Sequence, residues 1–177
     1  EKLEIVKNVT PLLTNKRKSH YLIADPLFNF YYKFVFPFNT MLEFGKFDGV
    51  KSYFINIFPT FLGYRFEEIC TQYMIQTIDM PSSVGKWWGP NPQTHEEEEI
   101  DIVVVAMDKT IHFAECKFQN KPISEQVLET LQRRSYLADS SSKREFWLFS
   151  KSGFTPDLKA NSKLHLIDLE EISRALL

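Results

Sequence analysis

The spacing of hydrophobic residues predicts alternating helices and strands over the last two thirds of the chain. From Pro59 to Thr77 apolar residues recur every three or four positions, the period of a helix with one buried face. The β-branched run from Ile100 to Ala106 is typical of a strand buried on both faces, and residues 110–118 follow as its hairpin partner. Helical spacing returns from Ser124 to Ala138.

Shorter patterns complete the order of elements. A strand is expected through Trp87 and Trp88, two more at residues 145–149 and 163–167, and Asp168 is expected to cap a final helix. The order helix, three strands, helix, two strands, helix predicts an α/β sandwich for residues 59–177.

The first 58 residues have a different character. Strand-like runs at Leu3–Val6 and His20–Ile23 predict a hairpin over residues 1–24, with Lys16, Arg17 and Lys18 at its tip. Asp25 and Pro26 are typical of a helix start. The aromatic segment that follows is apolar nearly all round, so we expect a buried helix that Pro37 ends, within a connector over residues 25–58.

The composition is that of a globular protein. It is 44% hydrophobic and 15% aromatic with 6 glycines, which excludes disorder, and no apolar run is long enough for a membrane span. Two cysteines without metal-ligand spacing predict buried thiols in the reducing cytoplasm. A net charge of −2 lacks the basic bias common in nucleic-acid binders, so DNA contacts would need local patches such as Lys16–Lys18. Since the chain starts with Glu1, we expect it to be a fragment.

Charged residues inside apolar strands are the main chemical signal. Asp101 lies in one such strand, and Glu115 and Lys117 share a face of the next. With a two-residue loop Asp101 would pair with Cys116 and lie on the wrong face. A three-residue loop would pair it with Lys117, diagonal to Glu115 and about 7 Å away at Cα. We expect an odd-length loop or a bulge, so that the two carboxylates converge. Two carboxylates at that separation can hold one hard cation.

Such a cation would assist phosphodiester hydrolysis, with Lys117 stabilising negative charge and Glu67 entering from a helix edge as an outer ligand. A buried salt bridge is the alternative interpretation. A Glu-x-Lys or Asp-x-Lys tripeptide is expected about once by chance in an ordinary chain, and Asp157-Leu158-Lys159 is a second match here.

Several motifs resemble known families. Glu99-Ile100-Asp101 with Glu115-Cys116-Lys117, after a helix bearing Phe66-Glu67, resembles the PD-(D/E)XK nuclease superfamily. More narrowly, the chain resembles an uncharacterised domain at the C-terminus of archaeal and bacterial AAA-type ATPases. The segments that carry this likeness are Tyr21–Pro26, Phe30–Val35, Phe66–Cys70, Trp87–Gly89 and Phe149–Phe154.

The resemblance implies a restriction-endonuclease-like αβββαβ core, a winged-helix remnant made of the hairpin and the aromatic helix, and an ATPase domain upstream. It also implies Mg²⁺ or Mn²⁺ held by Asp101, Glu115 and the backbone carbonyl of Cys116, with Lys117 assisting the nucleophile. The proline of the superfamily's name is replaced by Ile100.

Other candidates have plainer interpretations. Gln126 would contact the substrate or lie on an exposed helix face. His95–Glu99 is expected to be a solvated acidic loop rather than a metal cluster. Arg133 and Arg134 would line a DNA groove or lie on charged surface, and core packing is favoured over base stacking for at least one tryptophan.

The function expected is a magnesium-dependent, DNA-cleaving domain of an ATPase. The alternative is a non-catalytic nucleic-acid or protein-interaction module with the same fold.

Overall fold

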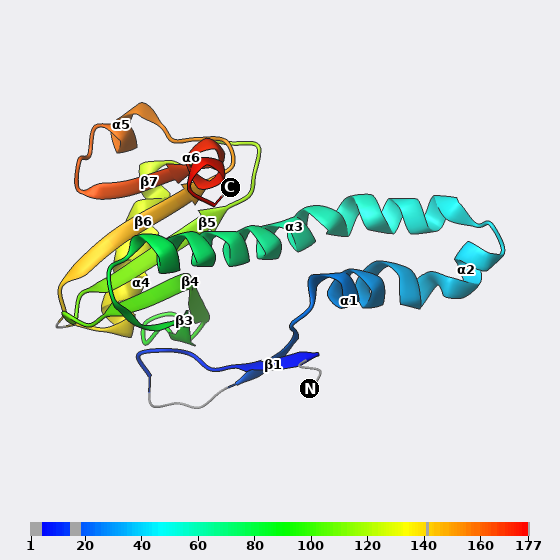
Figure 1. The fold of residues 1–177 in the computed structure, drawn as a ribbon, viewed down its shortest axis with the longest axis horizontal. Coiled ribbons are helices and arrows are strands. Elements are labelled where there is room, and N and C mark those ends of the chain that lie inside the picture. The colour runs from blue at the N-terminus through cyan, green and yellow to red at the C-terminus, as the bar shows by residue number, and fades with distance from the viewer. Residues whose placement is uncertain (1–4, 15–18, 141, 177) are drawn as a thin grey trace. The chain divides into compact units, whose positions relative to one another are not determined.

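The chain divides into two compact units, which we describe separately (Figure 1). The computed structural model describes residues 5–14, 19–140 and 142–176. Unit 1 takes the residues up to Val9 together with 19–65, and unit 2 takes residues 10–14 and 66–176. Within these described ranges, no helix is long and apolar enough to cross a membrane.

Unit 1 contains the N-terminal hairpin. Strands β1 (Val6–Val9) and β2 (His20–Ile23) pair antiparallel, with Val6 opposite Ile23, and form a two-stranded sheet separate from the larger sheet of unit 2. The second strand is where the sequence predicts it. The first strand is described from Val6, whereas residues 3 and 4 of the predicted Leu3–Val6 lie outside the described residues. The basic residues Lys16, Arg17 and Lys18 lie outside the described residues.

The aromatic segment is helical but changes its pitch. Helix α1 (Pro26–Phe30) starts as predicted, because Asp25 accepts a hydrogen bond from the Phe28 N–H at 2.9 Å. A π-helical turn η1 (Tyr31–Val35), a 3₁₀ turn η2 (Phe36–Phe38) and helix α2 (Asn39–Glu43) follow. The prediction that Pro37 ends the helix was wrong, because Pro37 occupies the first turn of η2, where its missing N–H costs no hydrogen bond.

The expected burial of this segment on all sides was also wrong. Leu27 is 72% exposed and Phe36 is 55% exposed, whereas Phe34 is buried. The Phe34 ring packs against rings from the following helix, with centroid distances of 5.1 Å to Phe54 and 5.4 Å to Phe61. One ring therefore anchors the segment.

Helix α3 (Phe47–Thr77) is 31 residues long and starts well before the predicted Pro59. The turn before it uses Gly45, whose φ of +68° favours glycine. Asp48 and Gly49 lie inside its first turns, and Pro59 lies within the helix. The two compact units divide between Arg65 and Phe66, inside α3.

Unit 2 is built on a mixed five-stranded sheet in the order β3-β4-β5-β6-β7. Strands β3 (Pro81–Pro90), β4 (Glu97–Ala106) and β5 (Ile111–Lys117) are antiparallel neighbours. Strands β6 (Arg144–Ser150) and β7 (Leu164–Asp168) continue the sheet in parallel with β5. Helices α4 (Glu125–Ala138), α5 (Pro156–Lys159) and α6 (Leu169–Leu176) complete the unit. The order predicted from sequence is found, with α5 added.

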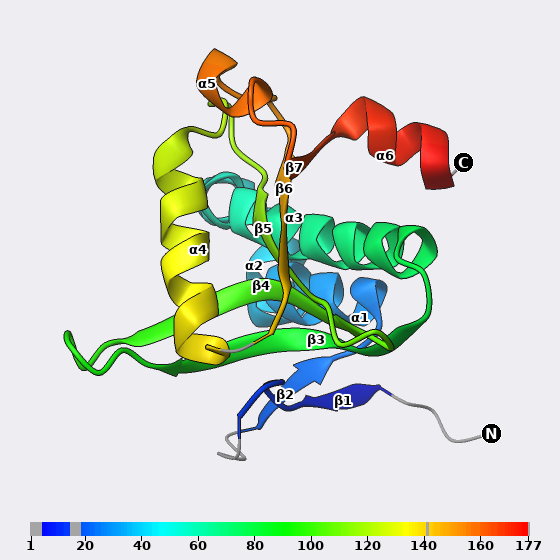
Figure 2. The same ribbon diagram turned by 90° about the vertical axis from the view of Figure 1, so that its left-hand side faces the viewer.

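Helices cover both faces of this sheet, and a core cluster lies under each. Figure 2 shows α4 on one side and the C-terminal half of α3 with α6 on the other. On the α3 side Phe66, Cys70 and Met74 pack against Ile102 and Phe149. On the α4 side Leu128 and Leu131 belong to a second cluster, with Phe113 and Leu148 among its sheet residues. An α/β architecture is therefore confirmed.

Two predictions about single residues are also confirmed. Both cysteines, Cys70 and Cys116, are buried free thiols. Trp87 and Trp88 are 4% and 8% exposed, so both belong to the interior rather than to a surface where bases could stack.

We expect Phe34→Ala to lower the free energy of unfolding by about 3 kcal/mol or more, because it removes a buried ring from the aromatic cluster. Denaturant unfolding followed by circular dichroism measures the change. Leu27→Ala, at an exposed position of the same segment, should change stability by less than about 0.5 kcal/mol. Equal effects of the two substitutions would contradict the assignment of Phe34 as the anchor.

Candidate functional site

The loop between β4 and β5 decides which residues meet at the candidate site. The Ala106 N–H bonds to the Thr110 carbonyl at 2.9 Å, and the Lys109 N–H bonds to the Ala106 carbonyl at 3.0 Å. The loop is therefore the three residues Met107, Asp108 and Lys109, closed by a positive φ of 68° at Lys109. Its length is odd, as predicted.

The loop starts one residue earlier than the expected pairing assumed, which changes the register. Ile102 pairs with Ala114 in the last pair of the β4–β5 ladder, and a β-bulge places Asp101 and Ile102 together opposite Lys86 of β3. The predicted pairing of Asp101 with Lys117 was wrong. Asp101 instead lies beside Cys116 and Glu115, because its Oδ2 accepts from the Cys116 N–H and its charge raises the pKa of Glu115.

Asp101 and Glu115 are both buried and differ in how their oxygens are used. Asp101, 8% exposed, accepts a hydrogen bond from the Cys116 N–H through Oδ2 at 2.8 Å. Glu115, 5% exposed, accepts from Lys117 Nζ through Oε1 at 2.5 Å. Its other oxygen, Oε2, is buried, has no hydrogen-bond partner, and lies 3.5 Å from Nη1 of Arg134.

The electrostatics confirm that these groups are close. Burial raises the pKa of Glu115, and the charge of Asp101 raises it further, against the opposing effect of Lys117. Burial by itself would lower the pKa of Lys117, but the Glu115 charge and hydrogen bond outweigh it, so the net shift is upward. At neutral pH Lys117 therefore stays cationic.

Glu67 reaches the same group of charges from helix α3. Burial and the charge of Asp101 raise the pKa of Glu67 to about 7, although Lys86 donates a hydrogen bond to its carboxylate. The sequence analysis identified Glu67 but missed Lys86. The available signal was a charged residue in a strand directly before two buried tryptophans, where an unpaired charge would be costly.

A second acidic centre lies at Glu98, which the sequence analysis assigned to a solvated loop. Glu98 instead belongs to β4, and its side chain is only 11% exposed. Arg133 donates to both its oxygens at 2.5 and 2.6 Å, and Arg134 Nε donates to Oε2 at 2.9 Å. The Arg133 hydrogen bond is the main cause that lowers the pKa of Glu98 to about 2. We call the eight side chains around these two centres the charge cluster: Glu67, Lys86, Glu98, Asp101, Glu115, Lys117, Arg133 and Arg134.

Not every predicted site residue joins the charge cluster. Gln126 is exposed on α4, and the Lys16–Lys18 tip is not among the residues described. The Cys116 thiol is buried, which raises its pKa well above the ordinary value. A nucleophilic role for this cysteine is therefore disfavoured, as expected.

At the candidate site, two carboxylates are the side chains that could ligate a metal ion. Within the described part of the chain, no group of three or more His, Cys, Asp or Glu side chains is arranged to hold a metal ion. A cation at Asp101 and Glu115 would therefore need water and backbone oxygens to complete its coordination.

The Glu98 pairing predicts a specific loss of stability in acid. A carboxyl with a lowered pKa in the folded state stabilises the protein above its unfolded pKa, and that contribution is lost as pH falls toward the folded value. We expect the melting temperature of the parent to fall more steeply between about pH 5 and 2 than that of Glu98→Gln. Glu129→Gln, at an exposed site of α4, should keep the steep profile of the parent. Parallel profiles for Glu98→Gln and the parent would contradict the pairing.

One relative is an archaeal protein of greater length. It is "Uncharacterized protein MJECL04" of Methanocaldococcus jannaschii, 26% identical over 184 residues. The match covers 97% of this chain and 39% of the relative, so this chain spans about two fifths of that protein. No solved structure matches the chain.

A family model described as "Archaea bacterial proteins of unknown function" matches residues 31–135. The matched range begins in the aromatic segment and contains α3, the strands β3 to β5 and nearly all of α4, and with them every member of the charge cluster. It covers more than half of the chain. The chain therefore belongs to this archaeal and bacterial family of unknown function, DUF234.

Proposed function

We propose that this chain is a nuclease-like domain that hydrolyses DNA phosphodiesters with Mg²⁺ or Mn²⁺ bound between Asp101 and Glu115. The observation that carries the proposal is the state of Glu115. Its Oε2 is buried and forms no hydrogen bond, and the charge of Asp101 acts on the same carboxylate. A buried charged oxygen without a hydrogen bond is costly. Arg134 Nη1 forms an ion pair with it at 3.5 Å, whereas a bound cation would be a direct ligand.

The residues present fit such a cation. Asp101 uses one oxygen for the Cys116 N–H, and no hydrogen bond to a described residue involves its Oδ1. Oδ1 of Asp101 and Oε2 of Glu115 would be the two carboxylate ligands, with the Cys116 carbonyl and water as further oxygens. When bound, the ion polarises a phosphoryl oxygen and lowers the pKa of an attacking water.

The neighbouring side chains would handle charge and protons. Lys117 is held beside Glu115 with 34% of its side chain exposed, so its ammonium can stabilise negative charge that develops on a phosphate. Glu67 has a pKa of about 7, which suits exchange of a proton near neutral pH. Its position next to Asp101 also suits an outer ligand.

The order of helices and strands in unit 2 supports a proposal about its fold family. In unit 2, α3 is followed by three antiparallel strands, then α4 and the parallel strand β6, which is the order of a restriction-endonuclease-like αβββαβ core. We further propose that the separate hairpin β1–β2 belongs to a winged helix, and that an ATPase domain accompanies this chain in a longer protein. The greater length of the Methanocaldococcus relative is compatible with that organisation.

A non-catalytic interaction module with the same fold is the second candidate, and one observation favours it. Every acid of the charge cluster except Asp101 has a basic partner: Glu67 has Lys86, Glu98 has Arg133 and Arg134, and Glu115 has Lys117. In this view the ion pairs are structural and no cation is needed.

Substitutions at the two carboxylates and the lysine separate their roles. Asp101→Asn and Glu115→Gln should each lower divalent-dependent cleavage of DNA at least about 100-fold, because each removes a ligand. Lys117→Ala should lower the rate about 100-fold while metal binding persists. Lys121→Ala, an exposed lysine after β5, should cleave like the parent. A parent that cleaves neither single-stranded nor duplex DNA with Mg²⁺ or Mn²⁺ would contradict the proposal.

Calorimetry distinguishes the two candidates even without a known substrate. Asp101→Asn should be at least as stable as the parent in metal-free buffer, because it relieves repulsion between two buried carboxylates. Magnesium at about ten times its dissociation constant should stabilise the parent by about 1.4 kcal/mol and the variant by less than half of that. A loss of about 3 kcal/mol in the variant, with no magnesium response in the parent, would favour the structural ion pair.

A further inference from the structure

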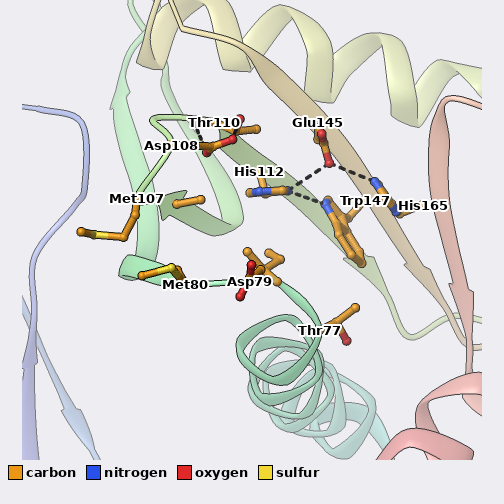
Figure 3. A pocket seen from close by; sticks show the side chains of 12 residues that line it. Thr77, Asp79, Met80, Met107, Asp108, Thr110, His112, Glu145, Trp147 and His165 are labelled. Atoms are coloured by element: carbon orange, nitrogen blue, oxygen red, sulfur yellow. Dashed lines mark hydrogen bonds and ion pairs between the residues drawn. The ribbon is translucent and has the colours of Figure 1, made fainter.

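Unit 2 also contains a cavity whose lining shares no residue with the charge cluster. Its volume is about 430 Å³, within the range of small-molecule sites, and it lies between the end of α3 and strands β4 to β7 (Figure 3). Apolar walls come from Ile78, Ala106 and Trp147. Met80 and Met107, both more than 60% exposed, are joined by a backbone hydrogen bond and also line the cavity. Such flexible thioether side chains pack well against aromatic rings.

A buried imidazole presents an unused N–H to this cavity. The side chain of His112 is 9% exposed, and its Nδ1 accepts a hydrogen bond from Trp147 Nε1 at 3.1 Å. Glu145 Oε2 also lies 3.5 Å from Nδ1, farther than the indole nitrogen. The indole N–H can only donate, so this shorter contact makes Nδ1 the acceptor and leaves the proton of the neutral ring on Nε2. Burial lowers the pKa of His112, so the neutral form prevails at pH 7. Among the residues described, Nε2 has no hydrogen-bond partner, and it lies on the side of the ring away from Trp147 (Figure 3).

Carboxylates are the other polar groups that decide what the cavity can hold. Asp108 uses both oxygens to bind Thr110, and Glu145 is engaged by His165 at 3.2 Å. Asp79, just after α3, has no hydrogen bond or ion pair with any described residue and lines the same cavity as His112 (Figure 3). Asp79 is thus the available acceptor.

These groups exclude several ligand classes. Three carboxylates disfavour a phosphate or another anion. An inorganic cation has no acceptor to offer the His112 N–H, which would stay unpaired. A simple ammonium ion would leave the His112 N–H without an acceptor. The ligand must therefore offer an acceptor to His112 and a donor to Asp79, on a body that tolerates apolar walls.

We propose that this cavity binds an uncharged, planar nitrogen heterocycle in which an acceptor ring nitrogen adjoins an exocyclic amino group, as in the bases of cytidine and adenosine. The ring nitrogen accepts from Nε2 of His112, and the amino group donates to Asp79. The two methionines pack against the ring. This site does not depend on the metal proposed at Asp101 and Glu115.

Two matched pairs of nucleosides test the pattern of donors and acceptors. Uridine and inosine have nearly the shapes of cytidine and adenosine, but a ring N–H and a carbonyl replace the ring nitrogen and the amino group. NMR titration of the full chain with EDTA present should show that cytidine and adenosine bind at least about tenfold more tightly than uridine and inosine, because the wrong partner leaves two polar groups unpaired. EDTA keeps the result independent of nuclease activity.

Variants locate the binding within the cavity. Asp79→Asn, at an exposed position, should weaken cytidine binding about tenfold, because the amino group then donates to a neutral amide oxygen instead of a charged carboxylate. Asp157→Asn removes the same charge from α5 and should bind like the parent. His112→Phe should also weaken binding, and its melting temperature reports whether it folds. Equal affinity for cytidine and uridine, unchanged affinity in Asp79→Asn, or no saturable binding at millimolar nucleoside would overturn the proposal.

Discussion

The register of β4 against β5 is the constraint on which the candidate site depends. The three-residue loop Met107–Lys109 sets that register through the last pair, Ile102 with Ala114, and Asp101 and Glu115 are the next residues along the two strands. A shift of one residue would move Asp101 to the opposite face, away from Glu115, because side chains alternate along a strand. The length of this loop thus decides whether Asp101 and Glu115 are two isolated buried charges or neighbours in one site.

Compensation of charge makes that centre compatible with a folded core. The charge cluster has four acids and four bases, and they are drawn from α3, three strands and α4. Isolated buried ions would be strongly destabilising, whereas hydrogen-bonded pairs reduce the cost. Asp101 accepts a hydrogen bond from a backbone N–H and has no ion pair with a described residue. Its negative charge therefore acts on the nearby acids and raises the pKa of both Glu67 and Glu115.

The sequence predicts the elements of unit 2 well because each strand and helix buries a periodic apolar face. Residues 100–106 and 124–138 were placed within a few residues. Asp101, Glu115 and Lys117 were singled out because charge is unusual among such neighbours, and Glu67 because it lies at a helix edge. The long-range partners could not be found this way. Lys86 and the two arginines at Glu98 pair across strands and helices, and local spacing carries no information on those distances. In unit 1 the aromatic pattern was misinterpreted, since hydrophobicity on all sides indicates burial only when enough partners surround the helix.

Arg134 couples two acids of the charge cluster, so a substitution at one affects the other. Its Nε donates a hydrogen bond to Glu98. Its Nη1 lies 3.5 Å from Oε2 of Glu115, the oxygen that accepts no hydrogen bond. A guanidinium keeps its proton under all ordinary conditions, so one fixed positive charge serves two acids on different strands. The energies of Glu98 and Glu115 are therefore not separable. Loss of either acid changes the surroundings of the other through Arg134, and a double substitution should differ from the sum of the single ones. Glu98, Glu115 and Arg134 therefore form one energetic unit.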